Sequence, residues 1–198
     1  MADDLQEGTV QAAVRTLRPV PNPPGALERL FEAHHDRVFR TAHRVTGSAA
    51  DAEDVLQTIF LRLLKSQDTL DLSPNPEAYL SRAAINASLD LMRSRTRSKL
   101  VGLEDADASA FESSAKNPEA EHVDRELQEL IRTAVARLGT TAGEMFVLRY
   151  YEGYENHEIA KLLGTSHLVV GVVLHRARTK LRKEIGHYLE QHVAQTNT

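Results

Sequence analysis

The chain has 198 residues, of which 28 are acidic and 24 basic, and it contains no cysteine. This length predicts one or two small domains, and the lack of cysteine excludes disulfides, thiolate metal sites and cysteine nucleophiles. No apolar run approaches the roughly 18 residues of a membrane span, and the N-terminus does not have the layout of a secretory signal. We therefore expect a cytoplasmic protein without membrane insertion.

The net charge of −4 is unevenly distributed, since residues 100–129 carry −7 and residues 130–198 carry +3. Two basic clusters flank the acidic segment: Arg93, Arg95, Arg97 and Lys99, and then Arg176, Arg178, Lys180, Arg182 and Lys183. Such clusters suit two phosphate-binding patches. They also suit solvated helix ends, where cations favour the C-terminal dipole. Charge alone leaves both interpretations open.

The first part of the chain predicts a tail followed by three helices. Residues 1–25 lack periodicity and end in PNPPG, which indicates a flexible tail. An apolar stripe from Leu27 predicts a helix that stops at Gly47, and Ser48 with Asp51 caps a second helix. The second buried stripe comprises Val55, Leu56, Ile59, Phe60, Leu63 and Leu64.

The third helix begins near Pro76, a residue suited to a first helical turn. Its expected inward residues are Tyr79, Leu80, Ala83, Ala84, Ala87 and Leu91. The first basic cluster lies at the far end of this helix. Together the three helices predict a first domain over residues 26–99.

Residues 100–125 are acidic and aperiodic, which predicts a flexible linker. A second domain follows over residues 126–190, with a tail over residues 191–198. Its first helix runs from Leu127 to Leu138, and Thr141 with Glu144 offers a capping box for the next.

Two further helices are separated by a three-residue turn. They cover Asn156 to Leu163 and His167 to about Ile185, with the turn Gly164-Thr165-Ser166 between them. This pattern is typical of a helix-turn-helix, in which the second helix is presented outward. Since no segment is rich in strand signals, the sequence predicts an all-α fold of two small helical domains.

An ordered series of segments resembles the extracytoplasmic function (ECF) sigma factors of bacterial RNA polymerase. The segments are LFEAHHDRVFRTAHRVTGSAADAEDVLQTIFLRLL, PEAYLSRAAINASLDLMRSR and EMFVLRYYEGYENHEIAKLLGTS with VVLHRARTKLRK. The resemblance implies a non-enzymatic factor that binds core RNA polymerase and promoter DNA and directs transcription initiation, as an alternative factor for stress or envelope responses. It also implies an anti-sigma protein as a partner.

The resemblance assigns polymerase docking to the helix that contains DAEDVLQTIF. The matching residues are Asp51, Glu53, Asp54, Gln57 and Thr58. Acidic side chains there would meet a basic partner surface. The alternative is that these carboxylates merely occupy a favourable helix N-terminus.

The resemblance assigns recognition of the −10 promoter element to the third helix, at Arg82, Asn86, Arg93 and Arg95. Guanidinium groups suit phosphates. Tyr79 stands where the family usually carries tryptophan, so it could stack on an unpaired base or belong to the core.

The second helix of the helix-turn-helix corresponds to the family's −35 reader. The positions expected to contact DNA are Ser166, His167, Val169, Gly171, Val173, His175, Arg176, Arg178 and Lys180. Where the family usually carries threonine, lysine and arginine, this chain has Val169, Gly171 and Val173. Valine cannot donate to guanine but can touch thymine methyls. We therefore expect weak sequence preference, or an apolar face that a protein partner covers.

Other functional classes find little support. The nine histidines show no metal-ligand spacing, and neither a phosphate-binding glycine loop nor a nucleophile elbow occurs, so we expect no cofactor, no metal site and no enzymatic activity. The acidic linker either threads into polymerase, as the resemblance implies, or is a solvated spacer. The alternative function is a helix-turn-helix regulator or partner-binding protein without sigma activity.

Overall fold

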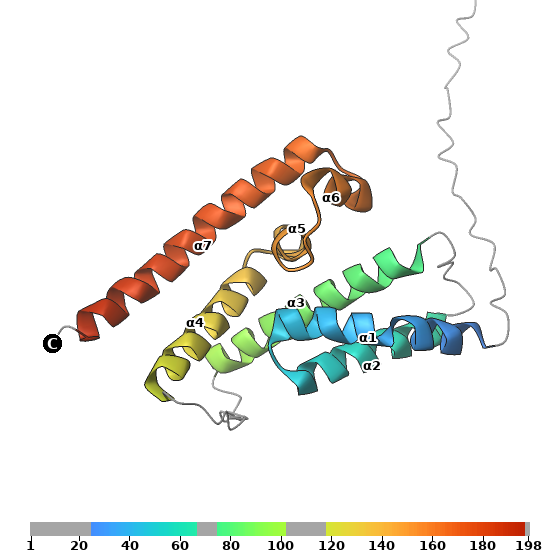
Figure 1. Ribbon diagram of the computed structural model, residues 1–198, viewed down its shortest axis with the longest axis horizontal. Helices are drawn as coiled ribbons and strands as arrows, with labels where there is room; N and C mark the ends of the chain where they lie inside the picture. Colours follow the sequence, from blue (N-terminus) through green and yellow to red (C-terminus); the bar gives the residue numbers. More distant parts are fainter. Residues whose placement is uncertain (1–24, 67–74, 102–117, 197–198) are drawn as a thin grey trace, which may run out of the picture.

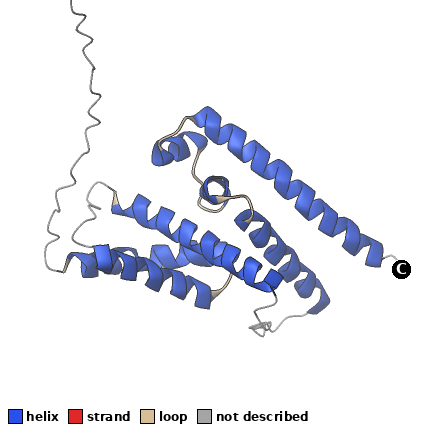
Figure 2. Cartoon of the chain, turned by 180° about the vertical axis from the view of Figure 1, so that it is seen from behind, coloured by secondary structure: helices blue, strands red, loops and turns tan. Residues whose placement is uncertain are grey.

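The computed structural model describes residues 25–66, 75–101 and 118–196, which form helices joined by short turns (Figure 1). The all-α prediction is confirmed in the described part of the chain, where Figure 2 shows blue helices joined by tan loops and no red strand. The predicted tail before Gly25 and residues 102–117 of the predicted linker lie outside the described residues. The helices are α1 (Ala26–Thr46), α2 (Ala49–Ser66), α3 (Pro76–Val101), α4 (Pro118–Ala136), α5 (Thr140–Tyr150), α6 (Asn156–Leu163) and α7 (His167–Thr196).

The turn between α1 and α2 forms as the sequence predicts. Gly47 adopts a left-handed conformation with φ 74°, and its N–H donates to the carbonyl oxygen of His43 over 2.8 Å. Glycine carries no steric penalty in this conformation, which explains why α1 stops there. The Ser48 hydroxyl then accepts a hydrogen bond from the backbone N–H of Asp51 over 3.3 Å, capping α2.

The three helices α1, α2 and α3 enclose the first apolar core. Its fully or nearly fully buried side chains include Val38, Ile59, Leu63, Leu80 and Ala84. Two residues expected inside are exposed instead: Leu64 at 50% and Tyr79 at 41%. Each is next to a buried leucine, Leu63 or Leu80, which faces the core in its place.

Helix α3 is buried on a second face that the sequence pattern did not predict. Ile85, Leu89 and Met92 are buried in the core of the second domain, and Val45 of α1 joins them. These positions follow each other at four- and three-residue spacing, which places them on one stripe of α3. The long helix therefore belongs to two cores at once.

The second domain contains α4, α5, α6 and α7, and α3 packs against both α4 and α5. Helix α4 begins at Pro118, within the segment predicted as linker, because Pro118, Glu119 and Glu121 are all suited to a first helical turn. Helix α7 continues to Thr196, past the predicted domain end at 190, and residues 187–196 contain neither glycine nor proline to stop it.

The helix-turn-helix forms at the predicted positions. Gly164 ends α6 in a left-handed conformation with φ 65°, and α7 leaves at an angle of 109° to α6. Ile159 and Ala160 of α6 pack with Val170 and Leu174 of α7. This buried contact fixes α7 as the outer helix of the pair (Figure 1).

No single helix in the described ranges combines the length and apolar composition of a membrane span. The bent pair α6 and α7 meets both measures only when its two helices are taken together.

Candidate nucleic-acid and partner interface

The first turns of α2 present a polar surface to solvent. Glu53, Asp54 and Gln57 are exposed, and Thr58 is half-buried. These four side chains share the outer side of α2, opposite the buried Val55 and Ile59. The helix core and the Ser48 cap hold this surface in place, and its carboxylates are available to a basic partner.

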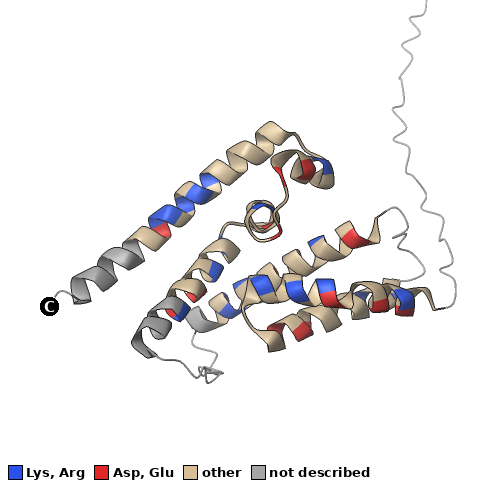
Figure 3. Ribbon diagram, in the orientation of Figure 1, with Lys and Arg blue, Asp and Glu red and all other residues tan. Residues whose placement is uncertain are grey.

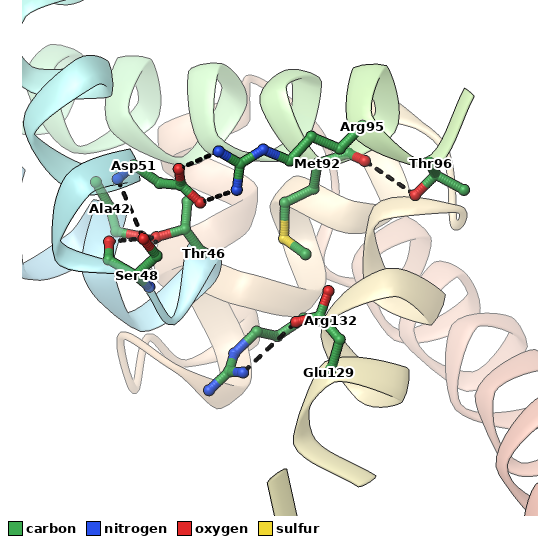
Figure 4. A network of polar contacts seen from close by, with 9 residues as sticks. All are labelled: Ala42, Thr46, Ser48, Asp51, Met92, Arg95, Thr96, Glu129 and Arg132. Carbon is green, nitrogen blue, oxygen red and sulfur yellow. Dashed lines mark hydrogen bonds and ion pairs between the residues drawn. The ribbon is translucent and has the colours of Figure 1, made fainter. Parts of the chain in front are cut away.

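Asp51 does not belong to that exposed surface. Its side chain is 4% exposed and forms a bidentate ion pair with the guanidinium of Arg95 on α3 (Figure 4). A carboxylate and a guanidinium match in this geometry, so each satisfies the other within the first domain. In this conformation, the predicted polymerase-binding Asp51 and the predicted DNA-binding Arg95 contact one another.

An apolar groove adjoins the exposed surface of α2. It has a volume of about 540 Å³ and is lined by Leu27, Phe31, Phe60, Leu61 and Leu64, with Glu28, Glu32 and Gln57 at the polar positions. Phe31 and Leu61 are 41% and 54% exposed. Because Gln57 belongs to both features, the groove extends the predicted docking surface toward the start of α1.

The predicted −10 face of α3 is covered by the second domain. The Arg82 Nε donates to a carboxylate oxygen of Glu144 on α5 over 2.7 Å, and the Glu144 side chain is only 7% exposed. The Arg93 Nε donates to the backbone carbonyl of Ala136 at the end of α4 over 2.8 Å. Arg82 and Arg93 are therefore joined to the second domain.

Asn86 lies between these two arginines on the same face of α3. Its Oδ1 is buried and has no hydrogen-bond partner among the described residues, and the same holds for one terminal nitrogen of Arg93. A buried polar atom without a partner loses its hydration and gains nothing in return, at a cost of about 1–3 kcal/mol. The second domain therefore buries this face without giving every polar group on it a hydrogen-bond partner.

The predicted capping box of α5 is wrong. Gly139 occupies the N-cap of α5, and no side-chain hydrogen bond closes that end. The carboxylate of Glu144 pairs with Arg82 instead of reaching back to the helix start. Local spacing carries no signal for this contact, because Glu144 and Arg82 are 62 residues apart in the chain.

Other side chains join the first domain to the turn after α5. Arg44 pairs with Glu152 over 3.2 Å, and an Arg37 nitrogen lies 3.4 Å from the Tyr154 hydroxyl. In addition, Arg132 of α4 lies so close to Gly47 that a Cβ there would overlap its guanidinium. Helix α1 and Gly47 of the first domain thus contact the turn after α5 and helix α4 of the second domain.

The first two turns of α7 expose apolar side chains. Leu168, Val169 and Val172 are 70%, 46% and 50% exposed, whereas Val170 is fully buried. Val173 and Gly171 are half-buried, and His167 and His175 are exposed. The Ser166 hydroxyl accepts a hydrogen bond from the N–H of Val169 over 3.3 Å, so Ser166 caps the helix.

Basic side chains follow on the next turns of α7, where Figure 3 shows a blue band after the uncharged first turns. Arg176, Arg178 and Lys180 are exposed. The Lys180 ammonium donates to the backbone carbonyl of Arg137 over 2.8 Å, at the end of α4. Arg176 and Arg178 are therefore the predicted phosphate contacts that point most freely to solvent.

An ion pair between Arg149 and Glu155 positions the helix-turn-helix. The two side chains approach to 2.8 Å, and Arg149 also donates to the backbone carbonyl of Tyr154. The hydrogen bond from Arg149 holds the pKa of the Glu155 carboxyl below its ordinary value, and burial raises the pKa of the Tyr151 phenol. Glu155 and Glu158 also form a capping box at the start of α6.

No group of three or more potential metal-ligating side chains is found in the described part of the chain.

Family models match both halves of this arrangement. Sigma-70 region 2 matches residues 30–98, which contain α2 and most of α1 and α3. Sigma-70 region 4 matches residues 128–181, which contain the helix-turn-helix. Together the two matches identify the chain as a sigma-70 type sigma factor of RNA polymerase.

The chain belongs to the ECF family of these sigma factors, as its sequence similarity to named relatives shows. The sigma factor is 33% identical over 171 residues to the ECF RNA polymerase sigma factor SigE of Mycolicibacterium smegmatis, a match that covers 85% of this chain and 63% of that protein. It is 30% identical to the RNA polymerase sigma-E factor of Streptomyces avermitilis, covering 80% of this chain and 84% of the relative. The sigma factor RpoE of Bartonella quintana, solved in complex with the anti-sigma factor NepR, aligns with a TM-score of 0.46 at 21% identity, covering 82% and 98% of the two chains.

Proposed function

We propose that the sigma factor binds core RNA polymerase and directs it to promoter DNA, acting in the cytoplasm as an alternative factor without enzymatic activity of its own. The observation that carries the proposal is the order of a region 2 and a region 4 match in one chain, each with an exposed polar or basic surface. An anti-sigma protein is the regulatory partner that we expect for such a factor.

The proposed polymerase contact is the α2 surface of Glu53, Asp54, Gln57 and Thr58 together with the adjoining groove. Exposed carboxylates beside an apolar groove suit a partner with basic and apolar side chains. Because Asp51 is buried in its pair with Arg95, we assign it to the stability of the first domain and not to this contact.

Polymerase binding tests this proposal. The double variant Asp54→Ala/Gln57→Ala removes two exposed side chains without touching the buried core, so the helical content should persist while co-purification with core polymerase is lost. The double variant Asp36→Ala/Arg40→Ala, at exposed positions of α1, is the control and should bind like the parent. If the parent chain and core polymerase do not associate, sigma activity is excluded and the helix-turn-helix regulator is the better description.

For promoter DNA, we propose that Arg82, Asn86 and Arg93 of α3 face the −10 element and that the start of α7 faces the −35 element. Arg176 and Arg178 would grip phosphates, which positions the helix without specifying sequence. Transcription from genomic fragments with reconstituted polymerase should yield defined start sites, and their absence with a polymerase-bound factor would contradict this assignment.

A further inference from the structure

One stripe of α3 carries the residues assigned to DNA and is also the stripe against the second domain. Arg82, Asn86, Leu89 and Arg93 follow at intervals of four, three and four residues, which places them on one helix face. Leu89 is fully buried in the second core, and Arg82 and Arg93 bond to α5 and to the end of α4. The Arg82 side chain is still 40% exposed, but DNA that reaches Asn86 and Leu89 must displace the second domain.

The contact at Arg82 resembles the contact that DNA would make. A guanidinium binds carboxylate and phosphate oxygens through the same donors. Here the acceptor is the Glu144 carboxylate, which is almost fully buried and has Arg82 as its ion-pair partner over 2.7 Å. Glu144 thus occupies the position on Arg82 that a phosphate would take.

The fit between the two domains is close in its apolar part and incomplete in its polar part. A Cβ at Gly143 would lie 3.0 Å from a methyl carbon of Leu89, so glycine allows α5 to approach α3. In contrast, the Asn86 Oδ1 and one Arg93 terminal nitrogen are buried without a hydrogen-bond partner in the described part of the chain. Groups left unsatisfied in this state gain partners when another ligand replaces the second domain.

We propose that Glu144 locks the free sigma factor in a closed state, in which its carboxylate replaces a DNA phosphate on Arg82 and the second domain covers the DNA-facing side of α3. The DNA-binding part of this inference rests on the proposed function. Binding through α3 then requires the two domains to separate, and the apparent affinity is reduced by the fraction of molecules that are open.

A distance measurement tests the lock without DNA or polymerase. The chain has no cysteine, so Ala50→Cys on α2 and Lys161→Cys on α6, both at exposed positions, accept a unique pair of spin labels. Pulsed electron-spin resonance should give one short distance in the parent. Glu144→Lys, which places two cations together, should add a population at longer distances, and the milder Glu144→Gln should do so to a smaller extent.

A charge exchange separates loss of the lock from loss of folding. In Arg82→Glu/Glu144→Arg the pair is reversed, and the short distance should return. Asp36→Lys on α1 introduces the same charge change at a position whose side chain is 74% exposed, and it should leave the distance as in the parent. If Glu144→Lys keeps the parent distance, or if the charge exchange fails to restore it, the lock is refuted.

DNA binding tests the inhibitory role. The probe is a fluorescein-labelled mixed-sequence 30-bp duplex with an unpaired 10-nucleotide bubble, titrated by anisotropy at fixed salt. Glu144→Lys should bind it roughly 5- to 20-fold more tightly than Asp36→Lys, a coupling within the range typical of linked sites. An altered distance with equal affinity in the two variants would overturn inhibition by Glu144, whereas the polymerase experiment above judges sigma activity separately.

Discussion

At the scale of single residues, Asp51 was predicted to contact polymerase, but it is buried in an ion pair with Arg95. Asp51 lies in the first turn of α2, where a carboxylate favours the helix dipole, and it is also held by Arg95 from α3. A carboxylate with 4% of its side chain exposed needs such a partner, because a buried charge without one is strongly destabilising.

Removal of the guanidinium should therefore destabilise the first domain. Arg95→Ala leaves Asp51 buried without this partner, and since Arg95 is 48% exposed, water will relieve part of the cost. We expect the free energy of unfolding to fall by about 1–3 kcal/mol, at the low end for breaking a buried pair. Urea titration followed by circular dichroism measures this change, with exposed Arg97→Ala as control. Equal stability of the two variants would contradict the structural role of the pair.

At the scale of elements, α7 combines two surfaces along one helix. Its first two turns expose Leu168, Val169 and Val172, and the following turns expose Arg176 and Arg178. An apolar face reads the thymine methyl group in the major groove but offers no donor to guanine. We propose that the basic turns hold the phosphates while the apolar turns meet the base edges.

Contact between the apolar turns of α7 and thymine predicts that the affinity for DNA depends on a single methyl group. Replacing thymine by uracil in the −35 duplex of an identified promoter removes the 5-methyl group and leaves every hydrogen-bonding edge intact. We expect binding by the parent to weaken by about 0.5–1 kcal/mol per methyl contact, near the value for one buried methylene. Val169→Ala should bind both duplexes more equally, and exposed Thr179→Ala is the control. Equal affinity of the parent for both duplexes would contradict methyl recognition.

At the scale of the whole molecule, α3 joins the two domains into one packed unit. Leu80 and Ala84 belong to the first core, whereas Ile85, Leu89 and Met92 belong to the second, which also contains side chains of α4, α5, α6 and α7. A helix shared by two cores couples their stabilities, because neither core keeps its packing when α3 leaves.

Because both cores contain side chains of α3, we expect a cavity at Leu89 to destabilise both domains. Leu89→Ala should lower the free energy of unfolding by about 2–4 kcal/mol, as for other buried leucines. Hydrogen exchange should then accelerate in α5 as well as in α3. Leu63→Ala, whose side chain lies in the first core alone, should accelerate exchange mainly in α1 and α2 and should affect α5 less than Leu89→Ala does. Unchanged exchange of α5 in Leu89→Ala would show that the domains do not depend on each other.

The sequence alone determined the elements and the family, because helix stripes, glycine stops and the Gly164-Thr165-Ser166 turn are local features that act within a few residues. It predicted the start of α2, α3 and α7 and the exposed carboxylates of α2. Only the tertiary structure decided what Asp51, Arg82 and Glu144 contact, since their partners lie 44 or 62 residues away in the chain. The second buried stripe of α3, with Ile85, Leu89 and Met92, was not predicted, because a helix pattern does not say whether a partner, DNA or a second domain covers an apolar face. That choice depends on how the two domains pack, and long-range packing leaves no local periodic signal.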